Sequence, residues 1–410
     1  MRHPDYQAIS RRFRQHEEWS DTTPLEFPRE NVDLFYLAFQ SHWAHVLVGR
    51  DRYRCEEHVV SFPAEPARQS PPDCVVKENT EFRYPLVRDH TTPGRRKRYT
   101  RGLVILHGLN ERSFTKYVPW AFQLWKGLEI PVILFPLTFH INRVHPGWLH
   151  EQKEDFCRRR ALPGNENYHR FNAVISDRLG SHPERFFWGA IQSYWDLVEL
   201  VAMIDAGNHP HFEPGARIDV LGFSAGGFVA LALLLENARN LFSNSRGILF
   251  SSCAAMRDIS LSSYLIVDQL AEIALMNLFV KYQQKLSNQR LNHWLDHHAE
   301  GTWIRSFCGL MPDRARLTAR LKEIAPRLLG IANTNDQVVP AGAMYNALQG
   351  IRRDTGVRME ELALGIHENP FVSSSYDPAD RSIITESLNV ERFGDAFEEF
   401  IRISVGHLSR

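Results

Sequence analysis

The feature that most constrains the fold is a glycine-flanked serine, Ser224, within residues 222–227. Residues 216–221, just before it, have the pattern of a short strand, whereas residues 228–235 are apolar nearly all round, as in a buried helix. A G-x-S-x-G segment at such a strand-to-helix turn holds the serine in a strained backbone conformation and lifts its hydroxyl clear of the sheet. The pattern therefore predicts Ser224 as a nucleophile, with an ordinary Gly/Ser-rich turn as the alternative.

Glycines next to this serine and in an earlier loop are expected to shape the backbone of the site. Gly222 and Gly226 are needed because a Cβ at either position would collide with the crossing strand or helix. Gly108 follows a continuous apolar strand and lets the chain turn its amides inward. A serine that attacks a carbonyl generates an oxyanion, which backbone N–H groups stabilise. We expect the N–H groups of Leu109 and Ala225 to form that pair.

An acid and a base that could serve Ser224 follow later in the chain. Residues 328–333 have the pattern of a strand, and Asp336 comes directly after it in a loop. A carboxylate there would hold a histidine in the correct tautomer, and Asp258 is a weaker alternative for the same role. His367 lies in a glycine-containing loop after the last predicted strand, where a general base would reach the serine.

These motifs together resemble the α/β-hydrolase superfamily. The resemblance is carried by His107-Gly108, the serine turn, Asp336 in its loop and His367. The order nucleophile, acid, histidine is the one that the superfamily uses, and the match runs roughly from residue 84 to the C-terminus. It implies an α/β fold with a mostly parallel, roughly eight-stranded sheet and helices on both faces. We interpret His107 as a buried structural residue that keeps the loop after the strand in place.

The chain of 410 residues is expected to contain a core with additions. We predict an N-terminal extension of mixed helix and loop at 1–73, an α/β-hydrolase core at 74–252 and 327–410, a polar insertion in that core at about 140–185, and a helical cap at 253–326.

Within the extension, residues 31–48 have the pattern of an apolar helix, and Val75-Val76 and residues 82–84 beyond it are candidate antiparallel edge strands. In the cap, residues 265–280 are strongly apolar but carry charges, so they are too charged and too short to span a membrane. A cap helix over the pocket, a subunit interface and simple burial are the alternatives for that segment.

Composition narrows the function further. Lys+Arg and Asp+Glu both number 48, which does not favour nucleic acid or a membrane surface as a partner. The odd, scattered cysteines, Cys157 and Cys308 among them, and an N-terminus without an apolar signal segment lead us to expect reduced thiols in the cytoplasm. His140 and His145 have no third ligand at metal-like spacing, so we expect no metal, and no cofactor either.

The function expected from these motifs is that of a serine hydrolase, carboxylesterase-like, which cleaves an ester, thioester or amide through an acyl-enzyme. The alternatives are a catalytically silent binding scaffold of the same fold and an acyltransferase with the same triad. An apolar cap would favour a small-molecule substrate with an apolar acyl or aromatic part, whereas Arg143 and Arg158–Arg160 would suit an anionic one. A homo-oligomer through the cap is a further expectation.

Overall fold

The computed structural model of this chain describes most of its residues. The described ranges are 3–15, 24–28, 31–47, 53–55, 58, 60–62, 72–90, 97–150, 158–159, 162–281, 288–307, 314–350, 352–371, 375–377, 382–384 and 390–410. Cys157, Cys308 and Arg160, which enter the sequence analysis, lie outside the described residues.

A large sheet forms the centre of the described molecule, and two small sheets lie outside it. The strands of the large sheet are β1 (Leu25–Phe27), β2 (Val32–Gln40), β5 (Glu81–Asp89), β6 (Tyr99–Leu106), β7 (Val132–Phe135), β8 (Phe212–Phe223), β9 (Gly247–Phe250), β10 (Leu328–Asn333) and β11 (Arg358–Leu362). The small sheets pair β3 (Tyr53–Cys55) with β4 (Val60–Phe62), and β12 (Ser375–Asp377) with β13 (Ser382–Ile384).

The strand order in the large sheet is β1-β2-β5-β7-β6-β8-β9-β10-β11. From β7 to β11 every neighbouring pair is parallel, whereas β5 runs antiparallel to both β2 and β7. The predicted α/β fold with a mostly parallel sheet is confirmed. The described sheet has nine strands instead of about eight, because β1 adds to the edge by pairing with β2.

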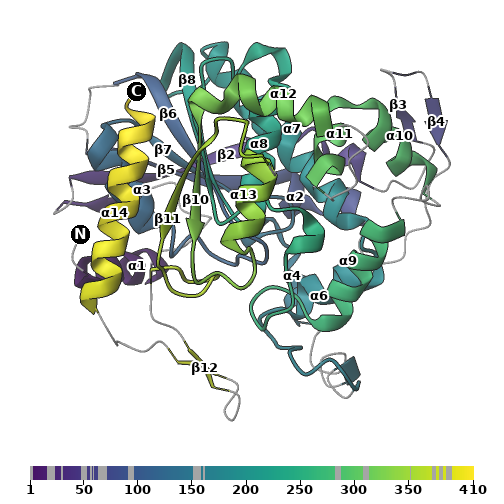
Figure 1. Ribbon diagram of the computed structural model, residues 1–410. Coiled ribbons are helices and arrows are strands. Elements are labelled where there is room, and N and C mark those ends of the chain that lie inside the picture. Colours follow the sequence, from purple (N-terminus) through teal and green to yellow (C-terminus); the bar gives the residue numbers. More distant parts are fainter. Residues whose placement is uncertain are drawn as a thin grey trace.

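Helices cover both faces of this sheet (Figure 1). The described helices are α1 (His3–Gln15), α2 (Lys77–Thr80), α3 (Val118–Leu128), α4 (Pro146–His150), α6 (Ala173–Ser181), α7 (Arg185–Asp205), α8 (Ala225–Glu236), α9 (Gln269–Lys281), α10 (Gln289–His297), α11 (Ala299–Phe307), α12 (Arg314–Ile324), α13 (Ala341–Gln349) and α14 (Val390–Leu408), of which α4, α6, α9 and α10 lie to one side of the sheet (Figure 1).

The alternation of side chains along each strand divides the core between the two faces. In β6, Leu103 and Ile105 pack with apolar residues of α1, α3 and α14, whereas Val104 and Leu106 pack with those of α7 and α8. All four side chains are fully or almost fully buried. A continuous apolar run is therefore needed in β6, because neither face of the central sheet meets water.

Two expectations for the N-terminal part are wrong. The helix expected over 31–48 is replaced at Val32–Gln40 by β2, whose nine residues all pair with β5. Pairing with a neighbouring strand outweighs the local pattern there, and the aromatic residues of the segment suit a pleated surface. Val75 belongs to a 3₁₀ turn (Asp73–Val75) and not to a strand. The antiparallel strand predicted at 82–84 is confirmed as part of β5, but it lies inside the sheet and not at its edge.

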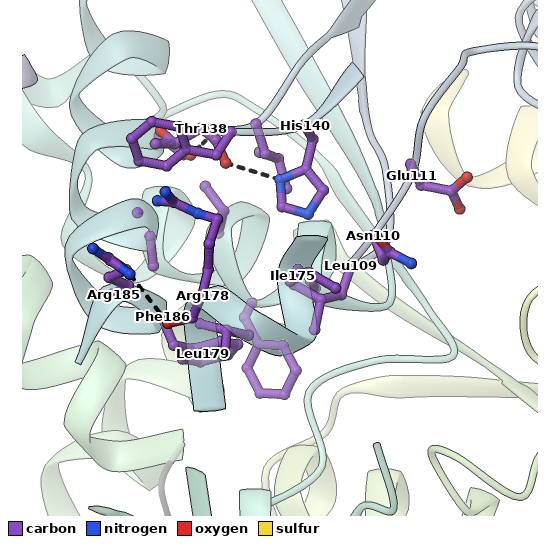
Figure 2. Close-up of a pocket in the computed structure, with 18 of the residues that line it drawn as sticks. Leu109, Asn110, Glu111, Thr138, His140, Ile175, Arg178, Leu179, Arg185 and Phe186 are labelled. Carbon is purple, nitrogen blue, oxygen red and sulfur yellow. Dashed lines mark hydrogen bonds between the residues drawn. The ribbon is translucent and has the colours of Figure 1, made fainter. Parts of the chain in front are cut away.

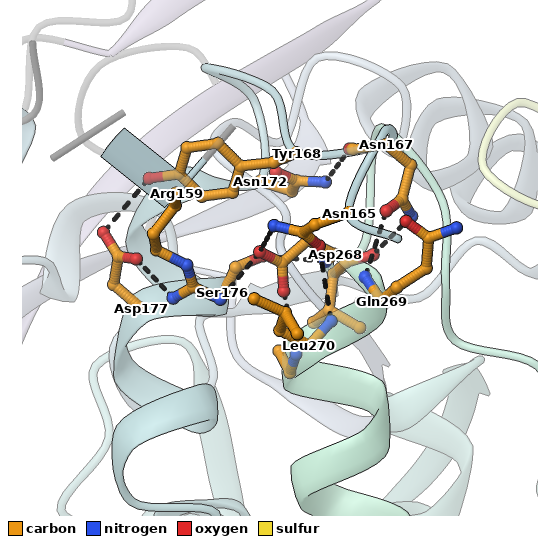
Figure 3. A network of polar contacts seen from close by, with 12 residues as sticks. Arg159, Asn165, Asn167, Tyr168, Asn172, Ser176, Asp177, Asp268, Gln269 and Leu270 are labelled. Atoms are coloured by element: carbon orange, nitrogen blue, oxygen red, sulfur yellow. Dashed lines mark hydrogen bonds and ion pairs between the residues drawn. The ribbon is translucent and has the colours of Figure 1, made fainter. Parts of the chain in front are cut away.

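The polar insertion at about 140–185 docks on the N-terminus of α9 through side-chain hydrogen bonds (Figure 3). Asp268 accepts from the Ala271 N–H at 2.8 Å, and its other oxygen accepts from Arg159 at 2.7 Å and Asn165 at 2.9 Å. Asn167 accepts from the Gln269 N–H at 3.0 Å. The insertion is polar because its side chains satisfy amides that the start of a helix leaves without intrahelical partners.

The apolar side chains of α9 are buried within this outer layer. Leu275 and Phe279 are almost fully buried, and the Phe279 ring packs edge-on against Phe186 and Phe187 of α7. Burial, the third alternative for residues 265–280, therefore accounts for these two side chains. The division of the chain into extension, core and cap stays a prediction.

Among the described residues, the apolar helices are too short or too interrupted by charge to cross a membrane.

Candidate active site

The serine turn joins β8 to α8. Ser224 has φ 51° and ψ −122°, a backbone conformation that costs a residue with a Cβ about 1–3 kcal/mol. The surrounding hydrogen bonds hold it there: the Ser224 N–H donates to the Phe250 carbonyl at 3.0 Å, and the Ser252 hydroxyl donates to the Ser224 carbonyl at 2.5 Å. The predicted strained turn between a strand and a helix is confirmed.

Close backbone packing explains the glycines of the turn. A Cβ on Gly222 would lie 2.5 Å from the Gly226 carbonyl oxygen, and one on Gly226 would lie 2.6 Å from the Leu106 carbonyl carbon. These partners are backbone atoms, so a rotamer change cannot relieve the overlap. Gly108 is less tight, because its Cβ would lie 3.3 Å from the Ser224 Cβ.

The structure brings Ser224, His367 and Asp336 into one hydrogen-bonded chain. His367 Nε2 lies 2.8 Å from Ser224 Oγ, and His367 Nδ1 lies 2.7 Å from Asp336 Oδ2. An ionised carboxylate only accepts, so Nδ1 carries the proton and Nε2 is left to accept from the serine hydroxyl. The exposed fractions are 7% for Ser224, 4% for His367 and 6% for Asp336, so little bulk water competes for these bonds.

Asp336 is held by its own loop. Its Oδ1 accepts from the backbone N–H groups of Val338 at 2.9 Å and Val339 at 2.8 Å, which leaves Oδ2 for His367. Asp258, the weaker alternative, is 39% exposed in its side chain and lies 3.6 Å from Arg257. It does not contact the serine chain, so the structure separates the two candidates.

Asn333 is a residue of the site that the sequence analysis missed. It is fully buried at the end of β10, where its Oδ1 accepts from the N–H groups of Leu364 at 3.1 Å and Asn335 at 3.0 Å. Its Nδ2 donates to the Gly365 carbonyl at 2.8 Å. One amide therefore ties the aspartate loop to the histidine loop. The only signal in the sequence is its place at the end of a strand just before the acid.

His107 is structural, as predicted. Its Nε2 accepts from the Leu137 N–H at 2.9 Å, so Nδ1 carries the proton and donates to the Gly108 carbonyl at 2.8 Å. Burial, followed by the nearby His140, lowers the pKa of His107 well below its ordinary value. The neutral ring fixes the loop that presents Leu109, and the Gly108 N–H is held by the Tyr117 hydroxyl at 3.0 Å.

A mostly apolar cavity of about 230 Å³ adjoins this site (Figure 2). Leu109 and Ala225, the predicted oxyanion residues, both line it, although the serine, histidine and aspartate do not. Ala225 begins α8, so its N–H is one of the amides that a helix leaves without an intrahelical partner. Apolar side chains from several elements line the remainder, including Val174, Ile175, Leu179, Phe186, Phe228 and Met256.

The pocket wall comes largely from the insertion and the start of α7. Among the residues whose side chains are described, none of α9 lines the pocket, so burial fits α9 better than the alternative of a cap helix over the pocket. The physical reason is that the side of α9 bearing Leu275 and Phe279 packs on α7, and the intervening layer of α6 lies nearer the pocket.

Two of the arginines proposed for an anionic substrate, Arg143 and Arg159, are paired with carboxylates of the protein. Arg143 is fully buried and lies 2.7 Å from Asp196, and Arg159 lies 2.7 Å from Asp268. In the pocket wall, Arg178 and Arg185 both bind Asp73.

His140 lines the pocket as a neutral ring. Its Nδ1 donates to the Thr138 carbonyl at 2.8 Å, and burial lowers its pKa to about 4, so the ring is neutral at pH 7. Its Nε2 is buried and finds no hydrogen-bond partner among the described residues. Figure 2 shows the ring on the same side of the pocket as Leu109 and Ile175.

A family model described as "Family of unknown function (DUF6051)" matches residues 2–395. The chain belongs to this family. No curated protein matches it.

Solved structures similar to this DUF6051 member are distant in sequence. A thermostable esterase from Pseudomonas putida has 12% identity and a TM-score of 0.40, over 100% of this chain and 91% of that chain. The peroxisomal alpha-beta-hydrolase of Saccharomyces cerevisiae has 15% identity and a TM-score of 0.37, over 91% and 90%. An esterase from Pyrococcus furiosus has 15% identity and a TM-score of 0.38, over 82% and 89%. At such distances, the chemistry of this chain has to be argued from its own residues.

Proposed function

We propose that this protein is a serine hydrolase that cleaves an ester, thioester or amide through an acyl-enzyme. The observation that carries the proposal is the hydrogen-bonded chain from Ser224 Oγ to His367 Nε2 at 2.8 Å and from His367 Nδ1 to Asp336 Oδ2 at 2.7 Å. It joins a nucleophile, a base and an orienting carboxylate in a largely dry environment, which is the arrangement that acyl transfer requires.

In this mechanism, Ser224 Oγ attacks the substrate carbonyl carbon while His367 Nε2 takes the hydroxyl proton. The oxyanion forms hydrogen bonds with the N–H groups of Leu109 and Ala225. His367 then returns the proton to the leaving alcohol, thiol or amine, and the acyl group remains on the serine. A water molecule repeats the sequence and releases the acid, while Asp336 stabilises the imidazolium at both stages.

The substrate we propose is uncharged, with an apolar acyl or aromatic part in the pocket next to Leu109 and Ala225. The mostly apolar lining of the pocket supports that choice. His140 Nε2 would accept a hydrogen bond from a hydroxyl or amide N–H of the substrate, since the neutral ring has no proton there.

Labelling with a fluorophosphonate tests the proposal, because the reagent phosphonylates activated serine hydroxyls and releases fluoride. We expect wild type to be labelled at Ser224, and Ser224→Ala to lose both labelling and hydrolysis of p-nitrophenyl esters. Asp336→Asn should reduce kcat by about 10⁴-fold, because it destroys the correct histidine tautomer.

Asp258→Asn is the matched control and should keep wild-type kinetics, because Asp258 lies at the surface beside Arg257. The proposal is contradicted if folded wild-type protein is not labelled at Ser224 and hydrolyses no ester of any chain length. That result would favour a binding scaffold. Transfer of the acyl group to a competing alcohol in preference to water would instead identify an acyltransferase.

A further inference from the structure

A second group of reactive side chains lies outside the serine site, between the β3–β4 hairpin and α10. Cys55 is at the end of β3, His58 follows in the turn, His293 lies on α10 and His298 ends that helix. Figure 1 shows β3 and β4 beside α10 at the margin of the molecule. One potential ligand atom from each of these four residues lies within 4.8 Å of all the others.

The distances between the potential ligand atoms are close to those of a tetrahedral metal site, although some are longer than in a site that holds its ion. Cys55 Sγ lies 3.5 Å from His58 Nδ1 and 3.2 Å from His298 Nε2. Ligands that bind Zn²⁺ tetrahedrally through nitrogen at about 2.05 Å and sulfur at about 2.3 Å are themselves about 3.3–3.6 Å apart. Separations of up to 4.8 Å in the cluster need a contraction of at most about 1.5 Å, which rotations of exposed His58 and half-buried His293 can supply.

The surroundings of His298 orient its ring for ligation. The ring stacks on Trp294, with centroids 3.9 Å apart and an interplanar angle of 9°. Its Nε2 faces Cys55, while its Nδ1 lies 3.8 Å from a Glu300 carboxylate oxygen. Trp195 and Trp294 indole N–H groups hold that same oxygen at 3.0 and 2.7 Å. Metal-ligating histidines usually donate their outer N–H to a carboxylate, and Glu300 stands on that side of the His298 ring, although 3.8 Å is longer than a hydrogen bond.

We propose that Cys55, His58, His293 and His298 bind a Zn²⁺ ion that fastens the β3–β4 hairpin to α10. A thiolate and three imidazoles are the donors that zinc prefers, and four protein ligands close its coordination sphere. Cys55 and His298 are almost fully buried, with exposed fractions of 3% and 4%. The cysteine loses its proton to solvent on binding, which leaves the site with one net positive charge opposite Glu300.

The site has a structural purpose instead of a catalytic one. None of its four residues lines the pocket next to Ser224, and a closed coordination sphere leaves no position for a substrate. The hairpin consists of two strands of three residues each, which cannot bury a core of its own. A metal that links it to α10 supplies the missing stabilisation.

Metal analysis of the full chain, produced without a histidine tag in zinc-supplemented medium, tests the proposal. We expect about one Zn²⁺ per chain after gel filtration, and less than about a tenth of that in Cys55→Ser and in His293→Gln. Replacing Zn²⁺ by Co²⁺ in wild type should give the visible bands of tetrahedral Co²⁺ with a thiolate charge-transfer band. That spectrum tests the ligand set even where a variant fails to fold.

His297→Gln is the matched control, since His297 is an exposed neighbour on α10 whose nitrogens are outside the cluster. It should keep a full complement of zinc. A chelator should lower the Tm of wild type but leave that of Cys55→Ser unchanged. The proposal is overturned if wild type incubated with Zn²⁺ and then desalted holds none, or if the Cys55→Ser/His293→Gln double variant retains it.

Discussion

At the residue scale, the contact between the serine turn and β6 leaves no room for a side chain. A Cβ on Gly226 would lie 2.6 Å from the Leu106 carbonyl carbon and 2.7 Å from the His107 carbonyl oxygen. We therefore predict that Gly226→Ala destabilises the protein by about 4 kcal/mol or more, because the backbone of β6 or α8 must move. Urea denaturation measures the effect.

Gly406→Ala provides the comparison for that experiment. Gly406 lies in α14 and a Cβ there would meet nothing within 4 Å. Alanine is the better helix former, so this change should stabilise the fold by about 0.5–1 kcal/mol. Equal effects of the two substitutions would contradict the steric explanation of Gly226.

Asn333 connects the loops that carry the acid and the base. Asn333→Ala removes one buried amide and leaves the Leu364 N–H and the Gly365 carbonyl without their partner. We expect a loss of about 2–4 kcal/mol in unfolding free energy, with a fall in kcat as His367 loses its position. The exposed Asn335 donates to the Leu364 carbonyl at 2.8 Å, and Asn335→Ala should cost less than about 1 kcal/mol because water replaces it. Similar losses for the two variants would refute the role given to Asn333.

At the scale of elements, α9 depends on the insertion for its first turn. Asp268→Ala would leave the Ala271 N–H uncapped and remove a carboxylate partner of the half-buried Arg159. The expected loss is about 2–4 kcal/mol, to be measured by thermal denaturation. Asp258→Ala removes an exposed carboxylate near only a surface arginine and should change stability by no more than about 0.5 kcal/mol. An unchanged Tm for Asp268→Ala would show that α9 docks without this network.

Helix α7 sets the width of the pocket through Gly189. This residue lines the cavity, and a Cβ there would lie 3.9 Å from Thr138, which lines it too. Gly189→Leu should fill part of the cavity without strain. We predict that kcat/KM for octanoyl esters falls by about 100-fold while that for acetyl esters stays within a few-fold of wild type. Equal losses on both chain lengths would mean that the acyl group does not occupy this pocket.

At the scale of the whole molecule, buried neutral histidines make the fold sensitive to acid. Burial lowers the pKa of His140 to about 4, that of His209 to about 3 and that of His407 to about 4. In the unfolded chain these rings bind protons below about pH 6.5, so between that pH and about 4 the unfolded state holds more protons. Stability should be full above about pH 7 and fall as the pH drops through this window.

Urea midpoints between pH 7.5 and 4.5 measure this dependence. The lowered pKa of His140 corresponds to a loss of about 3 kcal/mol in unfolding free energy on acidification. The His140→Gln variant should therefore lose less stability than wild type when the pH is lowered. Identical midpoints at pH 7.5 and 4.5 would contradict the prediction.

Local patterns predicted the central strands and the helix after the serine because these segments are apolar on both faces or all round. β10 has the predicted bounds, and α8 begins at the residue after Ser224. The N-terminal part was less predictable, since β2 is a strand only through its pairing with β5, a contact between residues some fifty positions apart. No periodicity within residues 31–48 records that partner.

By itself, the sequence determined the serine turn, the order of Ser224, Asp336 and His367, and the strands that carry them. The reason is that the steric limits on glycine positions and the burial of central strands are both visible in a short stretch of sequence. Only the tertiary structure decided that Asp336, and not Asp258, reaches the histidine, and that Asn333 joins the two loops. It alone placed Cys55 and His58 beside His293 and His298. Such contacts join residues far apart in the chain, and their geometry arises from packing that no local pattern encodes.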